Sequence, residues 1–326
     1  MKESPFVRNA FEKIKGYKET TVTLVTVLLV IVVSICSPVF LSGDNIRTTL
    51  IGLSCDGIIA IGMTLTLISG GFDLSVGSVM GLSAVIAATF SMMGMNIWLA
   101  SLISMIICTL VGAINGFLIG KVGINPFITT LGMMQVARGA VFIITSGTSL
   151  GISTSSKSFD FIGNGEVFGI PMIVLIFLVL TICGHFLIKR SAPAMNVFYV
   201  GSSEKAAKLS GINTGNVKLW VYTFSAFVAS IAGILSLSRF AVATANMGSG
   251  TEMRVISAAV IGGASLSGGE GSVFGTVLGV VMLNVINNAL VLFNVSVNWQ
   301  NLISGTILIL AVTVDVISHK KRTSQE

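Results

Sequence analysis

The chain has 326 residues, of which 53% are hydrophobic and only 10% are charged, and its formal net charge is +6 at pH 7. Soluble domains carry about 25% charged residues, so this composition excludes an ordinary soluble globular protein. It predicts an all-α polytopic membrane protein, because helices satisfy their own backbone hydrogen bonds inside a bilayer. The positive charge does not indicate nucleic-acid binding, since the basic residues lie in short segments between apolar runs.

The first segment, residues 1–20, mixes basic and acidic side chains, and we expect it to lie in the cytoplasm. An apolar run from Thr21 to Phe40 follows, close to the ~20 residues that a transmembrane helix needs. A cleaved signal peptide has a shorter apolar core and a small-residue cleavage site. We therefore expect this run to be retained as the first span.

Further apolar runs predict about ten transmembrane helices in a membrane domain of residues 21–317, followed by a cytoplasmic tail, 318–326. The run at 253–267 is short and rich in glycine, so a broken helix is expected there. The predicted spans lie near residues 21–40, 47–69, 75–93, 97–120, 125–146, 168–188, 216–238, 253–267, 272–293 and 299–317.

The basic residues predict the orientation of these spans, because they favour the cytoplasmic side of a membrane. We expect both termini in the cytoplasm, an even number of spans, and an outside loop at 147–167 that is rich in serine and glycine. With the N-terminus inside, the cytoplasmic segments hold every basic residue except Arg47, Arg138, Lys157, Arg239 and Arg254.

Residues 69–81 interrupt two apolar runs with four glycines and the carboxylate of Asp73. Backbone that leaves helical geometry at membrane depth is tolerated only against protein or a water-filled cavity. An acidic residue at that depth is costly unless it has a partner or a function. The segment therefore predicts a polar route through the protein.

Residues 262–275 have a sequence similar to that of this segment. Gly70-Gly71-Phe72-Asp73-Leu74-Ser75 resembles Gly262-Gly263-Ala264-Ser265-Leu266-Ser267, and each is followed by a Gly-Ser-Val-x-Gly sequence. Repeats with interrupted helices are a common transporter design, with the substrate site at the breaks. The alternative is chance recurrence of the small residues that let helices approach closely.

The longest expected cytoplasmic loop, residues 189–215, contains a sequence that predicts one short helix. Ser203 can cap its N-terminus, Glu204 suits the positive helix start, and Gly211 can end it. On these features alone, the helix is either a docking element for a partner or a solvated connector.

Three asparagines, Asn284, Asn287 and Asn288, lie at i, i+3 and i+4 and therefore share one helix face. Amide side chains both donate and accept hydrogen bonds, so this face suits a neutral polyol. The alternative is hydrogen bonding between helices, worth roughly 0.6 kcal/mol per bond in membranes.

Arg138 lies near the middle of its predicted span, on one face with Gln135. An unpaired arginine at that depth costs roughly 3 kcal/mol, so we expect it to meet an acid, Asp56 or Asp73, or to face water. Phe72, beside Asp73, either closes a substrate path or packs among apolar helices.

These segments resemble signatures of the ribose-type permeases of ATP-binding-cassette (ABC) sugar importers. The resemblance covers residues 70–78, 115–119, 206–212 and 262–276, in the same order. It implies an ABC importer permease fold in the bacterial cytoplasmic (inner) membrane, importing a ribose-like monosaccharide or small polyol. The implied partners are cytosolic ABC ATPase subunits, an extracytoplasmic sugar-binding protein, a second permease chain in a homo- or heterodimer, and membrane lipid.

The polar residues of the spans, with Phe72, are the candidates for the substrate pathway: Phe72, Asp73, Ser75, Asn115, Arg138, Asn284, Asn287 and Asn288. The resemblance implies that the helix at 203–211 has the ATPase-coupling role, with Ser203, Glu204, Ala206, Ala207, Leu209, Ser210 and Gly211.

The chain departs from the family pattern at three places. Gly201-Ser202-Ser203 stands where Gly-Gly-Asn is usual, Asp56 stands where asparagine is frequent, and Asn288-Ala289 replaces Asn-Gly. Serine caps a helix as asparagine does, so coupling is expected to persist. Asp56 lies within a span and leaves the identity of the substrate open.

The sequence has no Gly-x-x-x-x-Gly-Lys-Ser/Thr phosphate loop, nor a visible catalytic set or metal cluster. We therefore expect a transport subunit that is not an enzyme, has no cofactor, and depends on ATP used by partner subunits. Two alternatives remain: a branched-chain amino-acid ABC permease with charged contacts from Asp56, Asp73 and Arg138, and an ion-coupled secondary carrier using the two acids.

Overall fold

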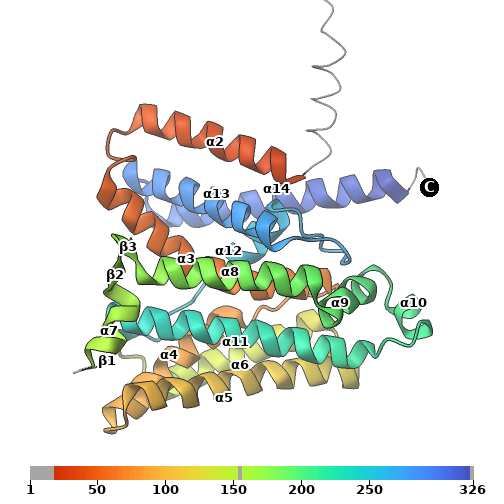
Figure 1. Ribbon diagram of the computed structural model, residues 1–326, viewed down its shortest axis with the longest axis horizontal. Helices are drawn as coiled ribbons and strands as arrows, with labels where there is room; N and C mark the ends of the chain where they lie inside the picture. Colours follow the sequence, from red (N-terminus) through yellow and green to blue (C-terminus); the bar gives the residue numbers. More distant parts are fainter. Residues whose placement is uncertain (1–17, 153–155, 324–326) are drawn as a thin grey trace, which may run out of the picture.

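The computed structural model describes residues 18–152 and 156–323 as a bundle of long helices lying side by side (Figure 1). Its long helices are α2 (Lys18–Cys36), α3 (Gly43–Ile68), α4 (Val76–Met92), α5 (Ile97–Phe117), α6 (Pro126–Thr145), α8 (Met172–Arg190), α11 (Thr214–Phe240), α13 (Val273–Leu292) and α14 (Val297–Thr323). A π-helical turn, η1 (Leu118–Val122), extends α5, and α12 (Thr251–Ile261) is shorter than the others.

The helices confirm the expected polytopic membrane fold, whereas the expected count of ten spans is approximate. In the described residues, seven helices are long and apolar enough to cross a membrane: α2, α3, α5 with η1, α6, α8, α11 and α13. The apolar helix α4 has 17 residues, and α12 has only 11. The helix α12 ends six residues before the expected limit at 267, as a broken span would.

The helices α3 and α11 form the middle of the bundle. In the most apolar 18-residue stretch of α3 and of α11, 78% of the residues are buried, against 17% in α2 and 22% in α6. The helices α2 and α5 lie at opposite edges of the bundle (Figure 1). Both are more apolar than α3 and α11, as expected of membrane-spanning helices that are hydrophobic all round.

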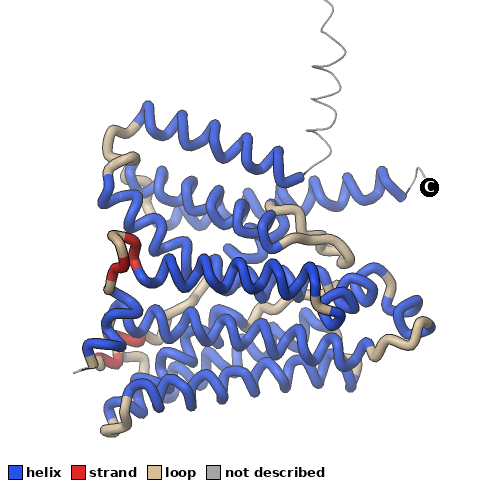
Figure 2. Tube along the Cα trace, in the orientation of Figure 1, coloured by secondary structure: helices blue, strands red, loops and turns tan. Residues whose placement is uncertain are grey.

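Short strands are confined to one end of the bundle (Figure 2). There β1 (Leu150–Gly151) pairs antiparallel with β4 (Val242–Ala243), and β2 (Glu166–Val167) pairs with β3 (Ile170–Pro171). The helix α7 (Lys157–Asn164) lies at the same end, with Phe159 buried. We call this the α7 end.

The opposite end carries two short helices, α9 (Ala192–Ser202) and α10 (Glu204–Leu209) (Figure 1). The helix α10 confirms the one expected at 203–211. Ala206 N–H donates to Ser203 Oγ at 3.2 Å, and Gly211 adopts a φ of +82° beyond the last turn. The sequence did not predict α9, which begins with a cap by Ser191. We call this the α10 end.

Two breaks, residues 69–75 after α3 and 262–272 after α12, separate helices at this end and share one geometry. Both helices end in a Schellman motif. Gly70 N–H donates to Leu67 O and Gly71 N–H to Thr66 O; in α12, Gly263 N–H donates to Val260 O and Ala264 N–H to Ala259 O. Gly70 (φ +82°) and Gly263 (φ +98°) occupy the left-handed position.

This correspondence supports the internal repeat and shifts its alignment by one residue. The sequence comparison set Gly70 against Gly262, whereas the structure sets Gly70 against Gly263, because only Gly263 has the positive φ. The following helices begin at Val76 and Val273, and the serines before them differ, because Ser272 caps its helix by accepting from Gly275 N–H whereas the Ser75 side chain makes no cap hydrogen bond. The second break is therefore longer than the first.

Candidate functional site

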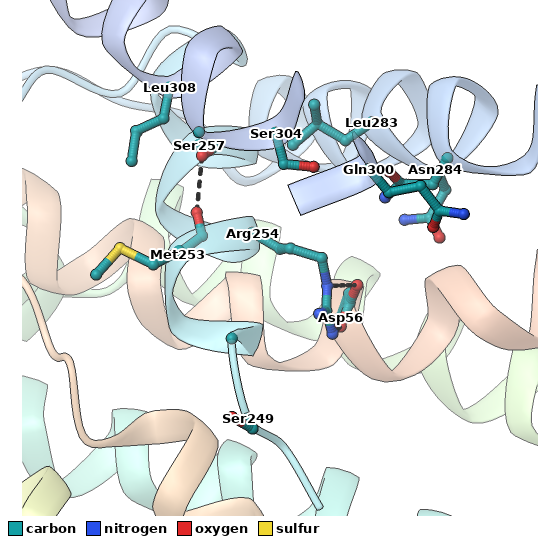
Figure 3. A pocket seen from close by; sticks show the side chains of 13 residues that line it. Asp56, Ser249, Met253, Arg254, Ser257, Leu283, Asn284, Gln300, Ser304 and Leu308 are labelled. Atoms are coloured by element: carbon teal, nitrogen blue, oxygen red, sulfur yellow. Dashed lines mark hydrogen bonds and ion pairs between the residues drawn. The ribbon is translucent and has the colours of Figure 1, made fainter. Parts of the chain in front are cut away.

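A cavity of about 730 Å³ lies between α3, α12, α13 and α14. This volume is within the range of about 300–1,000 Å³ that is typical of small-molecule sites. Apolar side chains such as Leu283 and Leu308 alternate on its wall with polar groups from all four helices (Figure 3). Asp56 lies near the middle of α3, so the cavity reaches the interior of the bundle.

An ion pair between Asp56 of α3 and Arg254 of α12 lines this cavity (Figure 3). Arg254 Nε donates to Asp56 Oδ2 at 3.1 Å, and Nη2 donates to Oδ1 at 3.2 Å. Nη2 also donates to Thr251 Oγ1 at 2.9 Å, which holds the guanidinium against its own helix. The Arg254 side chain stays 38% exposed and that of Asp56 16% exposed, so both present polar surface to the cavity.

Amide and hydroxyl groups complete the polar wall. Asn284 and Asn287 come from α13, and Gln300 and Ser304 come from α14. Asn284 Nδ2 donates to Val280 O at 3.0 Å. This hydrogen bond fixes the orientation of the amide, whose Oδ1 can accept a hydrogen bond from a ligand. The cavity thus offers acceptors, donors and a paired charge, all of which can form hydrogen bonds with hydroxyl groups. Within the described residues, no group of three or more His, Cys, Asp or Glu could hold a metal ion.

The structure separates the third asparagine from the other two. Asn288 Nδ2 donates to Asn45 Oδ1 at 2.8 Å, and Asn45 Nδ2 donates back to Asn288 Oδ1 at 3.0 Å. This reciprocal amide pair joins α13 to the start of α3, and Asn288 does not line the cavity. Asn288 therefore has a structural partner, whereas Asn284 and Asn287 remain at the cavity wall.

Asp73 lies in a closed polar cluster rather than on the cavity wall. It is fully buried, and its Oδ1 accepts hydrogen bonds from Ser75 N–H at 2.9 Å and Ser75 Oγ at 2.5 Å. Its Oδ2 accepts from Ser225 Oγ of α11 at 3.0 Å. Asn115 Nδ2 of α5 donates to Ser75 Oγ at 3.1 Å. This cluster joins the first break to α5 and α11.

Phe72 packs edge-on against Phe127 at the start of α6, with ring centroids 6.0 Å apart. Thr130 Oγ1, one turn along α6, lies 3.4 Å from Phe72 O as a hydrogen-bond donor. The aromatic ring therefore attaches the first break to α6.

Arg138 has different partners from those expected. The expected pairing with Asp56 or Asp73 is wrong, because Asp56 pairs with Arg254 and Asp73 with serines. Arg138 Nη1 instead donates to Ala245 O at 3.0 Å and Met247 O at 2.8 Å. It thereby fixes the segment that leads into α12, just before Ser249 and Gly250 reach the cavity.

Comparison with known proteins identifies the family. The family model described as "Branched-chain amino acid transport system / permease component" matches residues 45–312. The chain belongs to this family of membrane permeases. The expected resemblance to importer permeases is thus confirmed.

Relatives match the permease over most of its length. It is 35% identical over 291 residues to the ribose import permease protein RbsC of Haemophilus influenzae, covering 89% of this chain and 90% of the relative. It is 36% identical over 292 residues to RbsC of Bacillus subtilis, covering 88% and 89%. With the L-arabinose transport system permease protein AraH of Escherichia coli it shares 35% over 301 residues, covering 92% and 91%. No solved structure matches the chain.

The α10 end of the permease presents a small exposed surface. Ala207 is buried, whereas the neighbouring Leu209 is 83% exposed. Ala206, Ser210 and Gly211 are also exposed. The tip of α10 therefore exposes one apolar side chain and three small residues.

Glu204 fixes α10 to the permease bundle. Its Oε2 accepts from Lys218 Nζ of α11 at 2.6 Å, and its Oε1 pairs with Lys208 Nζ at 2.9 Å. Hydrogen bonds from Lys218 and then Lys208 lower the pKa of Glu204 from 4.5 to about 2. The carboxylate is therefore charged throughout the physiological range, and protonation does not break its ion pairs there.

Sequence reasoning missed several residues that line the cavity of the permease. Arg254 was noted only as a basic residue outside the cytoplasmic segments, and Ser249, Gln300 and Ser304 were not noted. Arg254 could have been found, because it begins a short apolar run and an arginine there requires a partner. Gln300 and Ser304 carry no comparable signal, since polar residues at i and i+4 in one helix are common.

Proposed function

We propose that this chain is the permease subunit of an ABC importer that moves a ribose-like monosaccharide or related small polyol into a bacterial cell by alternating access. The observation that carries the proposal is the cavity of about 730 Å³, lined by Asn284, Asn287 and the Asp56–Arg254 pair. The relatives, ribose and L-arabinose permeases at 33–36% identity, support the same substrate class.

The chemistry of the wall favours a neutral polyol. A sugar hydroxyl donates one hydrogen bond and accepts others, so it pairs with an amide or with either member of an ion pair. Because Asp56 and Arg254 neutralise each other, the cavity needs no charge on its ligand. The apolar side chains of Leu283 and Leu308 supply surface for the carbon face of the ring.

The energy for transport comes from other subunits. Cytosolic ATPase subunits bind the exposed tip of α10, a second permease chain completes the membrane unit, and an extracytoplasmic sugar-binding protein delivers the substrate at the α7 end. ATP is used by the ATPase subunits, and this chain has no cofactor. In this arrangement the α10 end and both termini face the cytoplasm of the bacterial inner membrane.

Alternating access uses the two breaks. The helices α3 and α12 carry the ion pair of the cavity and end at residues 69–75 and 262–272. Glycine turns at helix ends can change direction without breaking a continuous hydrogen-bond ladder. ATP-driven movement at α10 therefore reorients α3 and α12 about their breaks, and the cavity opens to one side at a time.

A second candidate is a branched-chain amino-acid permease, which the Asp56–Arg254 pair favours. A zwitterion could exchange partners with the pair, its ammonium binding Asp56 and its carboxylate Arg254. The family description also names this substrate class. The amide-lined wall of α13 has no role in this candidate, and we therefore place it second.

The test is uptake by the full transporter in liposomes. The permease is purified with its ATPase and binding-protein subunits, and uptake of labelled ribose, L-arabinose and leucine is measured with and without ATP. ATP-dependent ribose or arabinose uptake supports the proposal, whereas leucine uptake alone supports the second candidate. Accumulation by the permease alone under a proton or sodium gradient would identify an ion-coupled carrier and overturn both.

A further inference from the structure

Three segments that are distant in sequence meet at the α10 end. Gly269 N–H of the second break donates to Ile68 O at the end of α3, at 2.8 Å. Gly268 lies against Gly70 so closely that a Cβ at Gly268 would lie 2.8 Å from Gly70 Cα. The two breaks are therefore in direct backbone contact with each other.

The third segment is the end of α9, where Gly201 packs on that contact. A Cβ on Gly201 would overlap the Ile68 carbonyl oxygen and would lie 2.6 Å from Gly269 N. These are the two atoms of the hydrogen bond between the breaks. Ser202 follows closely, since a Cβ on Gly269 would lie 3.0 Å from Ser202 Cα. We call this three-way contact, Ile68–Gly70 with Gly201–Ser202 and Gly268–Gly269, the glycine junction.

No flexible linker separates the glycine junction from α10. Ser203 N–H donates to Tyr199 O of α9 at 3.1 Å, while Ser203 Oγ accepts from Ala206 N–H of α10 at 3.2 Å. One residue thus ends α9 and caps α10. A displacement of α10 therefore moves Gly201. Gly201 contacts backbone atoms of both Ile68 and Gly269, and it has no side chain whose rotation could absorb the displacement.

We propose that Gly201 and Ser202 are positioning residues that transmit movement of α10 to both helix breaks at once. The inference rests on the proposed function and adds the route of coupling to it. Because the same contact touches both breaks, α3 and α12 reorient together, and the Asp56–Arg254 pair between them is preserved during the movement. The glycine at 201 is required for this contact, since any side chain would separate the breaks.

The first test is Gly201→Ala in the complex of permease, ATPase and binding protein in liposomes. We expect at least a tenfold loss of labelled ribose transported per ATP hydrolysed, with the complex still assembled. Gly43→Ala is the matched control, because a Cβ there meets nothing within 4 Å and its φ is not positive. The control should match the wild type in uptake and in coupling.

The outcomes separate this inference from the proposed function. A wild-type complex that shows no ATP-driven sugar uptake overturns the proposed function, and this inference with it. A functional wild type together with a fully coupled Gly201→Ala variant overturns the inference alone. ATPase activity of the variant complex distinguishes uncoupling from a failure to bind the ATPase.

A second measurement needs no variant and applies even if Gly201→Ala does not fold. Hydrogen exchange of the wild-type complex is followed in peptides covering 65–71, 198–203 and 262–272, with and without a non-hydrolysable ATP analogue. The inference requires that protection changes in all three peptides in the same nucleotide state. A change confined to one or two of them, or no change in any, would overturn it.

Discussion

Asp56 and Arg254 form a bidentate ion pair across 198 positions of sequence, and each belongs to a helix that ends in the same type of glycine turn. The pair therefore connects equivalent helices of the two repeats, α3 and α12. Farther along the same helices, the glycine junction connects their ends. The cavity therefore lies beside two helices, α3 and α12, that contact each other through the ion pair in the middle of the bundle and through the glycine junction at the α10 end.

Replacing Asp56 by alanine should destabilise the permease and reduce sugar uptake. The variant leaves the Arg254 guanidinium with a single side-chain partner, Thr251. Loss of charge-assisted hydrogen bonds of this kind costs about 1.5–3 kcal/mol. Thermal unfolding in detergent, followed alongside uptake in liposomes, measures both effects.

The double variant Asp56→Ala with Arg254→Met is the control for this pair. It removes both charges, so it should be less destabilised than the sum of the two single variants, as expected for residues in contact. Additive effects of the two single substitutions would mean that the ion pair makes no net contribution to stability.

Asn287→Ala should affect transport and Asn288→Ala should affect stability, although the two residues are adjacent. Asn287 lines the cavity, so its loss should weaken sugar transport by about fivefold, the equivalent of one hydrogen bond of about 1 kcal/mol. Asn288 pairs with Asn45 instead. Its loss leaves the part-buried Asn45 amide with Phe40 O as its remaining partner and should lower the free energy of unfolding by about 1 kcal/mol.

The readouts are the KM for ribose uptake and the unfolding temperature, measured for both variants. A raised KM for Asn288→Ala with unchanged stability would contradict this assignment. The matching variant Asn45→Ala should also be less stable than the wild type, because either substitution removes both hydrogen bonds between the two amides.

The parts that the sequence predicted well are governed by local interactions. The short helix at 203–211 follows from the Ser203 cap and Gly211, which lie within a few residues of the backbone groups that they affect. The span positions likewise follow from runs of apolar residues. Both need no knowledge of which helices are neighbours.

The candidate site was predicted less well because it depends on non-local contacts. Helical spacing places Asn284, Asn287 and Asn288 on one face, but only packing decides that Asn288 meets Asn45, 243 positions away. The same holds for Arg138, whose partners are backbone carbonyls 107 and 109 positions away. Every residue has a backbone carbonyl, so the sequence does not indicate which carbonyls accept from an arginine.

Asp73→Ala should lower stability more than it alters substrate preference. The Asp73 carboxylate accepts from Ser75 and Ser225 in a fully buried cluster, and its removal leaves these donors without an acceptor. Each buried donor left unpaired costs about 1–3 kcal/mol. Unfolding temperature and membrane abundance measure the loss, and the ratio of ribose to arabinose uptake measures preference.

The milder variant Ser225→Ala removes one donor and leaves the carboxylate with its two hydrogen bonds from Ser75. It should be closer to the wild type in stability than Asp73→Ala. A changed sugar preference in Asp73→Ala, at full stability, would instead place Asp73 on the substrate path.

Glu204→Gln should loosen α10 from α11 at neutral pH but have no effect in strong acid. The Lys218 and Lys208 ammonium groups hold the pKa of Glu204 at about 2, below its ordinary value of 4.5. A lowered pKa in the folded state stabilises the fold above pH 4.5, and this contribution is lost as the pH falls toward 2. Because the carboxylate is partly exposed, the effect is modest.

Hydrogen exchange of residues 203–211 in the wild type and in Glu204→Gln, measured from pH 7 down to pH 3 with correction for intrinsic rates, tests this prediction. The variant should exchange faster by a constant factor from pH 7 to about 5, and the difference should shrink below that. A difference that instead disappears between pH 7 and 6 would show that a group other than Glu204 holds α10 in place, and the ion pair with Lys218 would lose its assigned role.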